Sequence, residues 1–266
     1  MLPTQSPLFW VTHKDRYLRQ LLIRDIEEQT GRSLIVYYAD CNSPVSNLDG
    51  NDDVYIAELL NALPKGNSVD LILETNGGAT DATEKICSIL RSAAPDLRVI
   101  IPRRAKSNGT VIAMCGHTIL MGVESELGPI DPSIGGVPVE FVLNAPAGTM
   151  TVIDIQVAMT ARKQTQKLAF DLLSTGMLKG TSDESIKSLV NKIATRDVYH
   201  SHGSVIDSKE AQSLGLNITF MPQDDILWRA IGLLRAMYQV DCPAAGYTKI
   251  FEGSKVSLVV ASPASP

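Results

Sequence analysis

The sequence lacks the features of a membrane protein or of a disulfide-stabilised one. No apolar run approaches the roughly 18 residues of a membrane span. The first seven residues have neither the basic start nor the apolar core of a signal peptide. The four cysteines are far apart and form no C-x-x-C pair, and Cys87 and Cys115 fall in apolar segments, where cysteine acts as a small core residue. We therefore expect a soluble protein of the reducing cytoplasm, with no membrane span.

Motifs for phosphate, nucleotide and nucleic-acid binding are also missing. The chain has no G-x-x-x-x-G-K-[ST] loop and no G-x-G-x-x-G turn, so nothing supports binding of a nucleotide cofactor. No S-x-x-K motif is present, which argues against a β-lactamase-type site. The net charge is −5, and the cluster of Arg103, Arg104 and Lys106 is too small for a nucleic-acid footprint. We expect no cofactor and no nucleic-acid partner.

Apolar strands and amphipathic helices alternate through the first half of the chain. Because the strands are almost continuously apolar, both of their faces should be buried, which indicates a mainly parallel sheet flanked by helices. The fold class is therefore α/β. The expected strands are 34–39, 69–75, 97–102 and 118–121, and the expected helices between them are 53–63, 79–93 and 107–115.

The two ends and the second half of the chain are more varied. A charged amphipathic helix is expected at 14–29, ended by Gly31. The segment 126–148 is rich in Gly and Pro and is expected to be irregular. Asp207 and Glu210 have the spacing of a capping box. The remaining expected elements are helices at 152–174, 182–195 and 224–238, a strand at 217–221, and two short strands within 246–260.

Ser107 lies in a turn that directly precedes a short apolar helix. Its pattern, Ala-x-Ser-x-Gly, is a nucleophile elbow without the first glycine. A hydroxyl at this place is next to the unpaired N–H groups of a helix N-terminus, as an attacking oxygen requires. A serine here is equally suited to cap the helix. Upstream, Gly77 and Gly78 end a buried strand and leave bare backbone N–H groups free to face a ligand.

Four segments occur in an order that resembles the superfamily of the Clp protease proteolytic subunit and signal peptide peptidase A. Within it, the chain is most similar to the serine dehydrogenase proteinase family. The resemblance covers roughly 34–221 and implies a Clp/crotonase-like fold. It implies an N-terminal helical extension at 1–32, a serine peptidase domain at 33–240, and a C-terminal tail at 241–266 with short strands and a disordered end. The matching segments are Asp70 to Gly78, Ser107 to Thr110, Leu127 to Pro132, and His202 to Leu216.

The resemblance implies a role for each part of the site. Ser107 is the expected nucleophile, and the N–H groups of Gly78 and Asn108 are the expected oxyanion hole. Substrate would bind beside the glycine turn, at Asn76, Gly77 and Ala79. The family commonly has Pro where this chain has Asn76; because Asn tolerates turn geometry and can cap a helix, we expect the loop to keep its shape.

The general base is left open by the sequence. In the Clp subunit the catalytic His lies in the segment that resembles Leu127 to Pro132, and the Asp lies just before the last matching segment. This chain has the two reversed, with Asp131 near the expected His position and His202 near the expected Asp position. His202 as base and Asp131 as its orienting partner would fill both roles. Signal peptide peptidase A uses a Lys instead.

Two further possibilities concern neighbouring residues. Lys163, and less so Lys167, is the candidate for a lysine base, although the polar residues around it favour an exposed position. His200 and His202 are two positions apart, the spacing of a metal pair on one face of a strand, but no nearby Cys or carboxylate completes a ligand set, so we expect no metal.

The sequence thus predicts a soluble serine peptidase that hydrolyses peptide bonds through an acyl-enzyme at Ser107. Peptide or protein would be its substrate, and the resemblance implies a homo-oligomer, for which the final helix and tail offer an interface, and leaves room for an activating partner. Two alternatives remain open. One is a crotonase-like acyl-CoA enzyme, which shares the fold and the oxyanion hole but needs no serine; the other is a catalytically degenerate scaffold.

Overall fold

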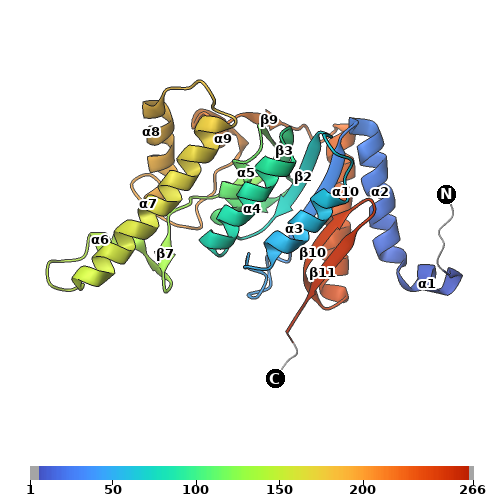
Figure 1. Ribbon diagram of the computed structural model, residues 1–266, viewed down its shortest axis with the longest axis horizontal. Helices are drawn as coiled ribbons and strands as arrows, with labels where there is room; N and C mark the ends of the chain where they lie inside the picture. The colour runs from blue at the N-terminus through green and yellow to red at the C-terminus, as the bar shows by residue number, and fades with distance from the viewer. Residues whose placement is uncertain (1–5, 264–266) are drawn as a thin grey trace.

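The protein is built on one seven-stranded sheet. The computed structural model describes residues 6–263, and its sheet has the order β11-β10-β1-β2-β3-β5-β9 (Figure 1). Strands β1, β2, β3, β5 and β9 are parallel, whereas β10 and β11 are antiparallel to their neighbours. In sheet order the strands are Ser257–Ala261, Tyr247–Gly253, Ser33–Ala39, Val69–Glu74, Leu97–Ile101, Thr118–Met121 and Ile218–Phe220. The predicted α/β class with a mainly parallel sheet is confirmed.

Helices cover both faces of this sheet. On one face, α2 (Lys14–Thr30) and α10 (Ile226–Ala244) pack on the strands in one apolar cluster (Figure 1). The other face carries a larger cluster to which six helices contribute. These are α3 (Asp52–Asn61), α4 (Thr80–Ala93), α5 (Asn108–Ala113), α7 (Val152–Thr175), α8 (Asp183–Ala194) and α9 (Ser208–Ser213).

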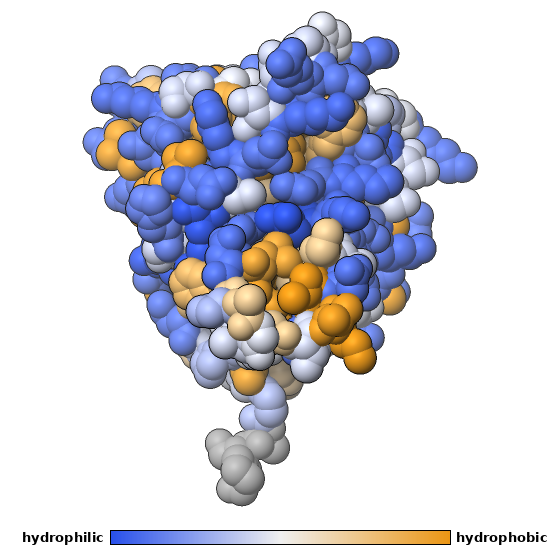
Figure 2. All heavy atoms as spheres, turned by 90° about the vertical axis from the view of Figure 1, so that its left-hand side faces the viewer, coloured by the Kyte–Doolittle hydropathy of each residue, from blue (hydrophilic) through white to orange (hydrophobic). Residues whose placement is uncertain are grey.

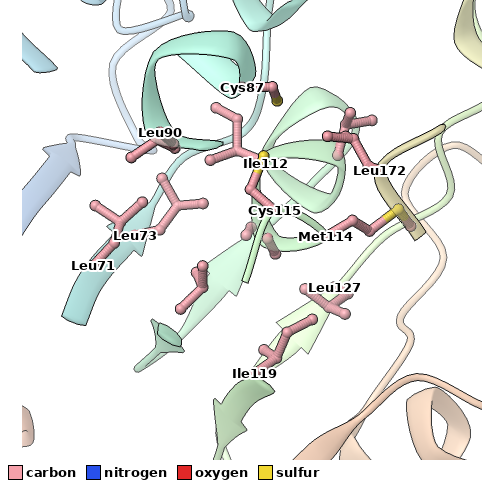
Figure 3. Close-up of a cluster of buried hydrophobic side chains, with 14 of the residues drawn as sticks. Leu71, Leu73, Cys87, Leu90, Ile112, Met114, Cys115, Ile119, Leu127 and Leu172 are labelled. Carbon is pink, nitrogen blue, oxygen red and sulfur yellow. The ribbon is translucent and has the colours of Figure 1, made fainter. Parts of the chain in front are cut away.

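The strands are apolar throughout because each face of the sheet lies under helices. Along β1, Ile35 and Tyr37 belong to the larger cluster, while Leu34 and Val36 belong to the smaller one. Figure 3 shows part of the larger cluster, where Leu71 and Leu73 of β2 approach side chains of α4 and α5. This packing fixes the strand ends, from which the functional loops leave.

The C-terminal end of the chain widens the sheet. The two predicted short strands are present as β10 and β11, and β10 pairs with β1 so that Ala39 lies opposite Lys249. Helix α10 runs further than predicted, to Ala244. The expected disorder of the end falls in part on residues 264–266, outside the described residues, and the division into 1–32, 33–240 and 241–266 stays a prediction.

The expectation of an irregular segment at 126–148 is wrong in part. A short helix, α6 (Val139–Leu143), forms there, preceded by the hairpin of β7 (Ser133–Ile134) and β8 (Val137–Pro138). The hairpin forms because its two turn glycines both adopt positive φ. The segment begins with β6 (Glu126–Leu127), which pairs with β4 (Arg104–Ala105).

Two smaller features also differ from expectation. A short helix, α1 (Pro7–Thr12), precedes α2. The capping box at α9 is only half formed, because Asp207 accepts the N–H of Glu210 whereas the Glu210 carboxylate accepts a hydrogen bond from the Tyr199 hydroxyl instead. Across residues 6–263, no helix combines the length and the apolar character that crossing a membrane would take.

Candidate active site

Two glycines shape the turn that follows β2. Gly77 and Gly78 have φ of 91° and 157°, values that side-chain-bearing residues rarely adopt. A Cβ on Gly78 would lie 2.2 Å from the carbonyl oxygen of Leu48, and one on Gly77 would lie 2.8 Å from that of Lys106. The turn therefore requires glycine at both positions, because Gly77 lies directly against the segment that carries Ser107 and Gly78 lies directly against the backbone of Leu48.

Ser107 is held in a strained backbone conformation. Its φ is 52° and its ψ is −124°, and it is the one non-glycine residue with positive φ among those the structure describes. Although it occupies the N-cap position of α5, its side chain makes no capping hydrogen bond. The capping interpretation thus loses its support, and strain of this kind concentrates at functional sites.

The backbone N–H groups at the two predicted oxyanion positions have no protein acceptor among the described residues. Within the described residues, neither Gly78 nor Asn108 donates a backbone hydrogen bond, whereas Gly77 donates to the Thr75 hydroxyl and Gly109 to the Lys106 carbonyl. The side-chain amide of Asn108 donates from Nδ2 to the Gly78 carbonyl at 2.6 Å. The peptides at both predicted oxyanion positions are therefore adjacent and have N–H groups available for a ligand.

His202 and Asp131 form a hydrogen-bonded pair. Nδ1 of His202 lies 2.7 Å from Oδ1 of Asp131, which is 2% exposed, while the imidazole is 43% exposed. The second carboxylate oxygen of Asp131 accepts from Nε of Arg196 at 2.8 Å. With Nδ1–H donated to the carboxylate, Nε2 is the free acceptor nitrogen that a general base needs.

Arg196 was not singled out from the sequence. Besides binding Asp131, it donates to the His200 carbonyl at 3.3 Å, and its guanidinium lies 5.1 Å from the Phe141 ring centroid. It thus fixes the carboxylate from the side opposite His202. No local pattern marks it, because its partner lies 65 positions away in the chain.

Lys106 connects the Ser107 segment to the loop that carries His202. Its ammonium donates to the carbonyls of Leu127 at 3.2 Å and Ser204 at 2.9 Å, and pairs with Glu126 at 2.9 Å. A bridge between Leu127 of β6 and Ile206 joins the two segments that Lys106 contacts. The residue directly before Ser107 is therefore tied to a residue two positions after His202. In the described part of the chain no hydrogen bond joins Ser107 to His202 themselves, and such bonds are often formed only with substrate.

The remaining candidates lie in other surroundings. Lys163 is exposed on α7, and Lys167 pairs with Asp171 on the same helix at 2.5 Å. His200 directs Nδ1 to the Arg196 carbonyl at 3.0 Å, away from the partner of His202. No group of three potential metal ligands was found in the described residues.

The predicted substrate-binding residues are partly engaged by the protein. Asn76 donates its amide to the Cys41 carbonyl at 2.9 Å, so it braces the neighbouring loop and does not cap α4. The Ala79 N–H donates to the Leu48 carbonyl at 2.9 Å. That the loop keeps the shape found in the family stays a prediction; the contact that Asn76 makes is to the Cys41 carbonyl.

The sheet and its flanking helices define an α/β protein whose candidate site lies at the carboxyl ends of the parallel strands. A model of the ClpP-like SDH-type serine proteinase family matches residues 15–229. This is most of the chain, and the protein belongs to that family.

Individual relatives agree in sequence to a moderate degree. One uncharacterized protein of Methanocaldococcus jannaschii is 32% identical over 181 residues, which is 65% of this chain and 61% of that protein. A second from the same organism is 26% identical over 209 residues, or 74% of this chain and 70% of that protein. The chain thus spans about three fifths of the length of the first relative. A solved structure of a ClpP1 point mutant from Listeria monocytogenes matches 79% of this chain and 99% of its own, with 15% identity and a TM-score of 0.46.

Proposed function

We propose that this protein is a serine peptidase with Ser107 as nucleophile and His202 as general base. The observation that carries the proposal is the backbone of Ser107, which is strained, makes no capping bond and lies against the Gly77–Gly78 turn. A structural cap would have neither the strain nor the free hydroxyl. Membership in a serine proteinase family supports the same assignment.

In the proposed reaction, the Ser107 hydroxyl oxygen attacks the carbonyl carbon of the scissile peptide bond. Its proton moves to Nε2 of His202, whose Nδ1 stays bonded to Asp131. The carbonyl oxygen becomes an oxyanion that accepts the N–H groups of Gly78 and Asn108, and each such donor lowers the barrier by roughly 3–4 kcal/mol. Imidazolium then gives its proton to the leaving amine, and water hydrolyses the acyl-enzyme along the reverse proton path.

Arg196 holds a further place in this scheme. A carboxylate that is 2% exposed needs a counter-charge, and Arg196 supplies one without entering the reaction. Asp131 is thereby kept oriented while the imidazole gains and loses its proton.

The alternatives are less well supported. A crotonase-like acyl-CoA enzyme would use the two N–H groups but has no need of a strained serine or of a paired imidazole. A lysine base is also less favoured. An amine is free to accept a proton near neutral pH only when burial disfavours its charged form, and Lys163 is exposed.

We further propose that the chain assembles with copies of itself in the cytoplasm. Apolar side chains gather at the end of the molecule formed by α6 and the start of α7 (Figure 2). The most exposed are Val152 and Ile153, at 75% and 74%. This surface and the final helix with the tail are alternative oligomer interfaces. Light scattering distinguishes them by comparing the mass of wild type with that of Ile153→Glu, which should fall only if the α6–α7 surface is the interface. The four free cysteines fit a reducing compartment.

The test of the activity is a fluorophosphonate probe followed by peptide mapping. We expect the probe to label wild-type protein on Ser107, and a peptide or ester substrate to protect against labelling. Heat-denatured protein is the control for nonspecific reaction. A folded, assembled protein that never labels at Ser107 and turns over neither peptide nor ester would overturn the proposal.

A further inference from the structure

A fully buried lysine lies on the strand that the C-terminal hairpin adds to the sheet. Lys249 of β10 is 0% exposed, although lysine is rarely buried without partners. Its ammonium donates to both oxygens of Asp52, at 2.7 and 2.9 Å, to the Asp49 carboxylate at 2.7 Å, and to the Asn47 carbonyl at 2.9 Å. The partners lie in the segment that leads into α3 and at the first residue of that helix.

The residue between two of these partners is the one that holds the glycine turn. Leu48 donates its N–H to the Gly77 carbonyl at 2.9 Å, and its own carbonyl accepts the N–H of Ala79 at 2.9 Å. These two bonds bracket Gly78, which approaches Leu48 so closely that a Cβ there would lie 2.6 Å from the Leu48 nitrogen. The orientation of the Gly78 peptide is therefore set by the backbone of Leu48.

Lys249 fixes that backbone from both sides, since it binds the carbonyl of Asn47 before Leu48 and the side chain of Asp49 after it. Asp52 completes the arrangement by accepting the Asp49 N–H at 3.1 Å and the Tyr37 hydroxyl at 2.7 Å. A rigid chain of contacts thus runs from β10 through Leu48 to Gly78.

We propose that Lys249 is a positioning residue for the oxyanion hole. The inference rests on the proposed function, because it assigns Lys249 the task of holding the Gly78 N–H where the oxyanion develops. Lys249 lies beyond the residues 15–229 that match the family, and by this proposal the C-terminal hairpin contributes to the site as well as widening the sheet. Small displacements of such donors matter, since a misplacement of about 1 Å can cost about 100-fold in rate.

The experiment compares variants that break this contact with one that breaks another buried ion pair on the same strand. Lys249→Met alone would leave buried carboxylates without a counter-charge, so it is combined with Asp52→Asn, which removes the most buried of them. Asp49→Ala is the milder variant, because its side chain is half-exposed. The matched control is Glu252→Gln, which weakens the Arg19–Glu252 pair on the opposite face of β10.

Steady-state kinetics and the rate of fluorophosphonate labelling are measured on full-length protein, well below each variant's unfolding temperature. We expect kcat and the labelling rate to fall about 10- to 100-fold in the double variant, with KM nearly unchanged, and to fall less in Asp49→Ala. Affinity for a peptide boronate, which occupies the oxyanion hole, should weaken in parallel. Glu252→Gln should lose stability but keep kcat.

Two results separate the possible failures. If wild-type protein does not label at Ser107, the proposed function fails and Lys249 has nothing to position. If wild type labels, and folded Lys249→Met/Asp52→Asn and Asp49→Ala both label at the wild-type rate, the lysine is structural only and the inference is overturned.

Discussion

The two ends of the parallel sheet are organised in opposite ways. At the carboxyl ends of β2 and β3 the chain forms the Gly77–Gly78 turn and the strained Ser107, with free N–H groups beside them. At the amino ends the same strands are joined by an ion network, in which Asp70 binds Arg32 at 2.5 Å and Arg98 at 2.6 Å. The carboxyl end leaves the N–H groups of Gly78 and Asn108 unpaired, whereas at the amino end two arginines engage both carboxylate oxygens of Asp70.

A cavity makes the contrast sharper. A pocket of about 370 Å³ opens at the amino end, lined by residues such as Arg32, Leu63 and Lys255. Its Arg32 is already committed to ion pairs with Asp70 and Asp96. The volume of a pocket therefore does not identify the site; unpaired backbone donors and a serine with a strained backbone do. Changes at the carboxyl end should lower activity, whereas changes at the amino end should alter stability and leave activity intact.

The largest effect is expected at Ser107. Both Ser107→Ala and Ser107→Gly should lower hydrolysis by about 10⁴-fold or more, because the attacking oxygen is gone. The two should differ in stability, with the glycine variant more stable than the alanine one by about 1 kcal/mol, since only glycine relieves the positive φ. Chemical denaturation measures this difference. Equal stability of both variants would mean that the strain is absent in solution.

The next largest effect is expected at His202. His202→Gln should reduce kcat by about 10²- to 10⁴-fold, because general-base catalysis contributes that much. Lys163→Met is the matched comparison and should leave kcat unchanged, since its side chain is exposed. Both are assayed with the same ester and probe. A strong loss in the lysine variant alone would favour a Ser–Lys dyad and contradict our assignment.

A smaller effect is expected for Arg196→Met, which leaves Asp131 without its second partner. We expect about a tenfold loss of kcat and a shift in its pH profile, because the imidazole loses a well-oriented carboxylate. The control is Arg162→Met, which breaks the ion pair between Arg162 and Glu140 of α6 and should leave kcat and its pH profile unchanged. An unchanged pH profile in Arg196→Met would show that Asp131 is oriented without it.

The smallest effect is expected at the amino end, from Asp96→Asn. The hydrogen bond from Arg32 lowers the pKa of Asp96 below 3.8, so this carboxylate stabilises the fold above about pH 4 and the contribution is lost as pH falls through its folded pKa. The variant should lose at most about 1 kcal/mol near pH 6, and its unfolding free energy should fall less steeply below pH 4. Activity should stay at the wild-type level. A drop in kcat would break the separation between the two ends.

Local sequence patterns predicted the frame of the molecule and the Ser107 turn. Strands such as 69–74 are apolar because helices cover both faces, and this signal is contained in the strand itself. Ser107 and the two glycines were found because a turn of this kind requires particular residues at adjacent positions. The meeting of Asp131 with His202 was expected from the family resemblance.

What could not be predicted depends on contacts between distant parts of the chain. The partners of Lys249 lie about 200 positions away, at 249 against 47–52, and nothing in either segment indicates the other. The half-formed capping box at Asp207 failed for a related reason, because Tyr199 offers Glu210 a better partner than the helix end does. The short helix α6 was missed because Gly and Pro in its flanks obscured five apolar and acidic residues.

The burial of α5 determines which part of the site can act as a switch. All six of its residues are buried, so Ser107 is mounted on the core and cannot shift without disturbing it. His202, by contrast, lies on the irregular segment 195–207 between α8 and α9, with its ring substantially exposed. Of the two candidate catalytic side chains, the imidazole is therefore the more accessible, and a regulating partner that binds from solvent can contact it without disturbing the core.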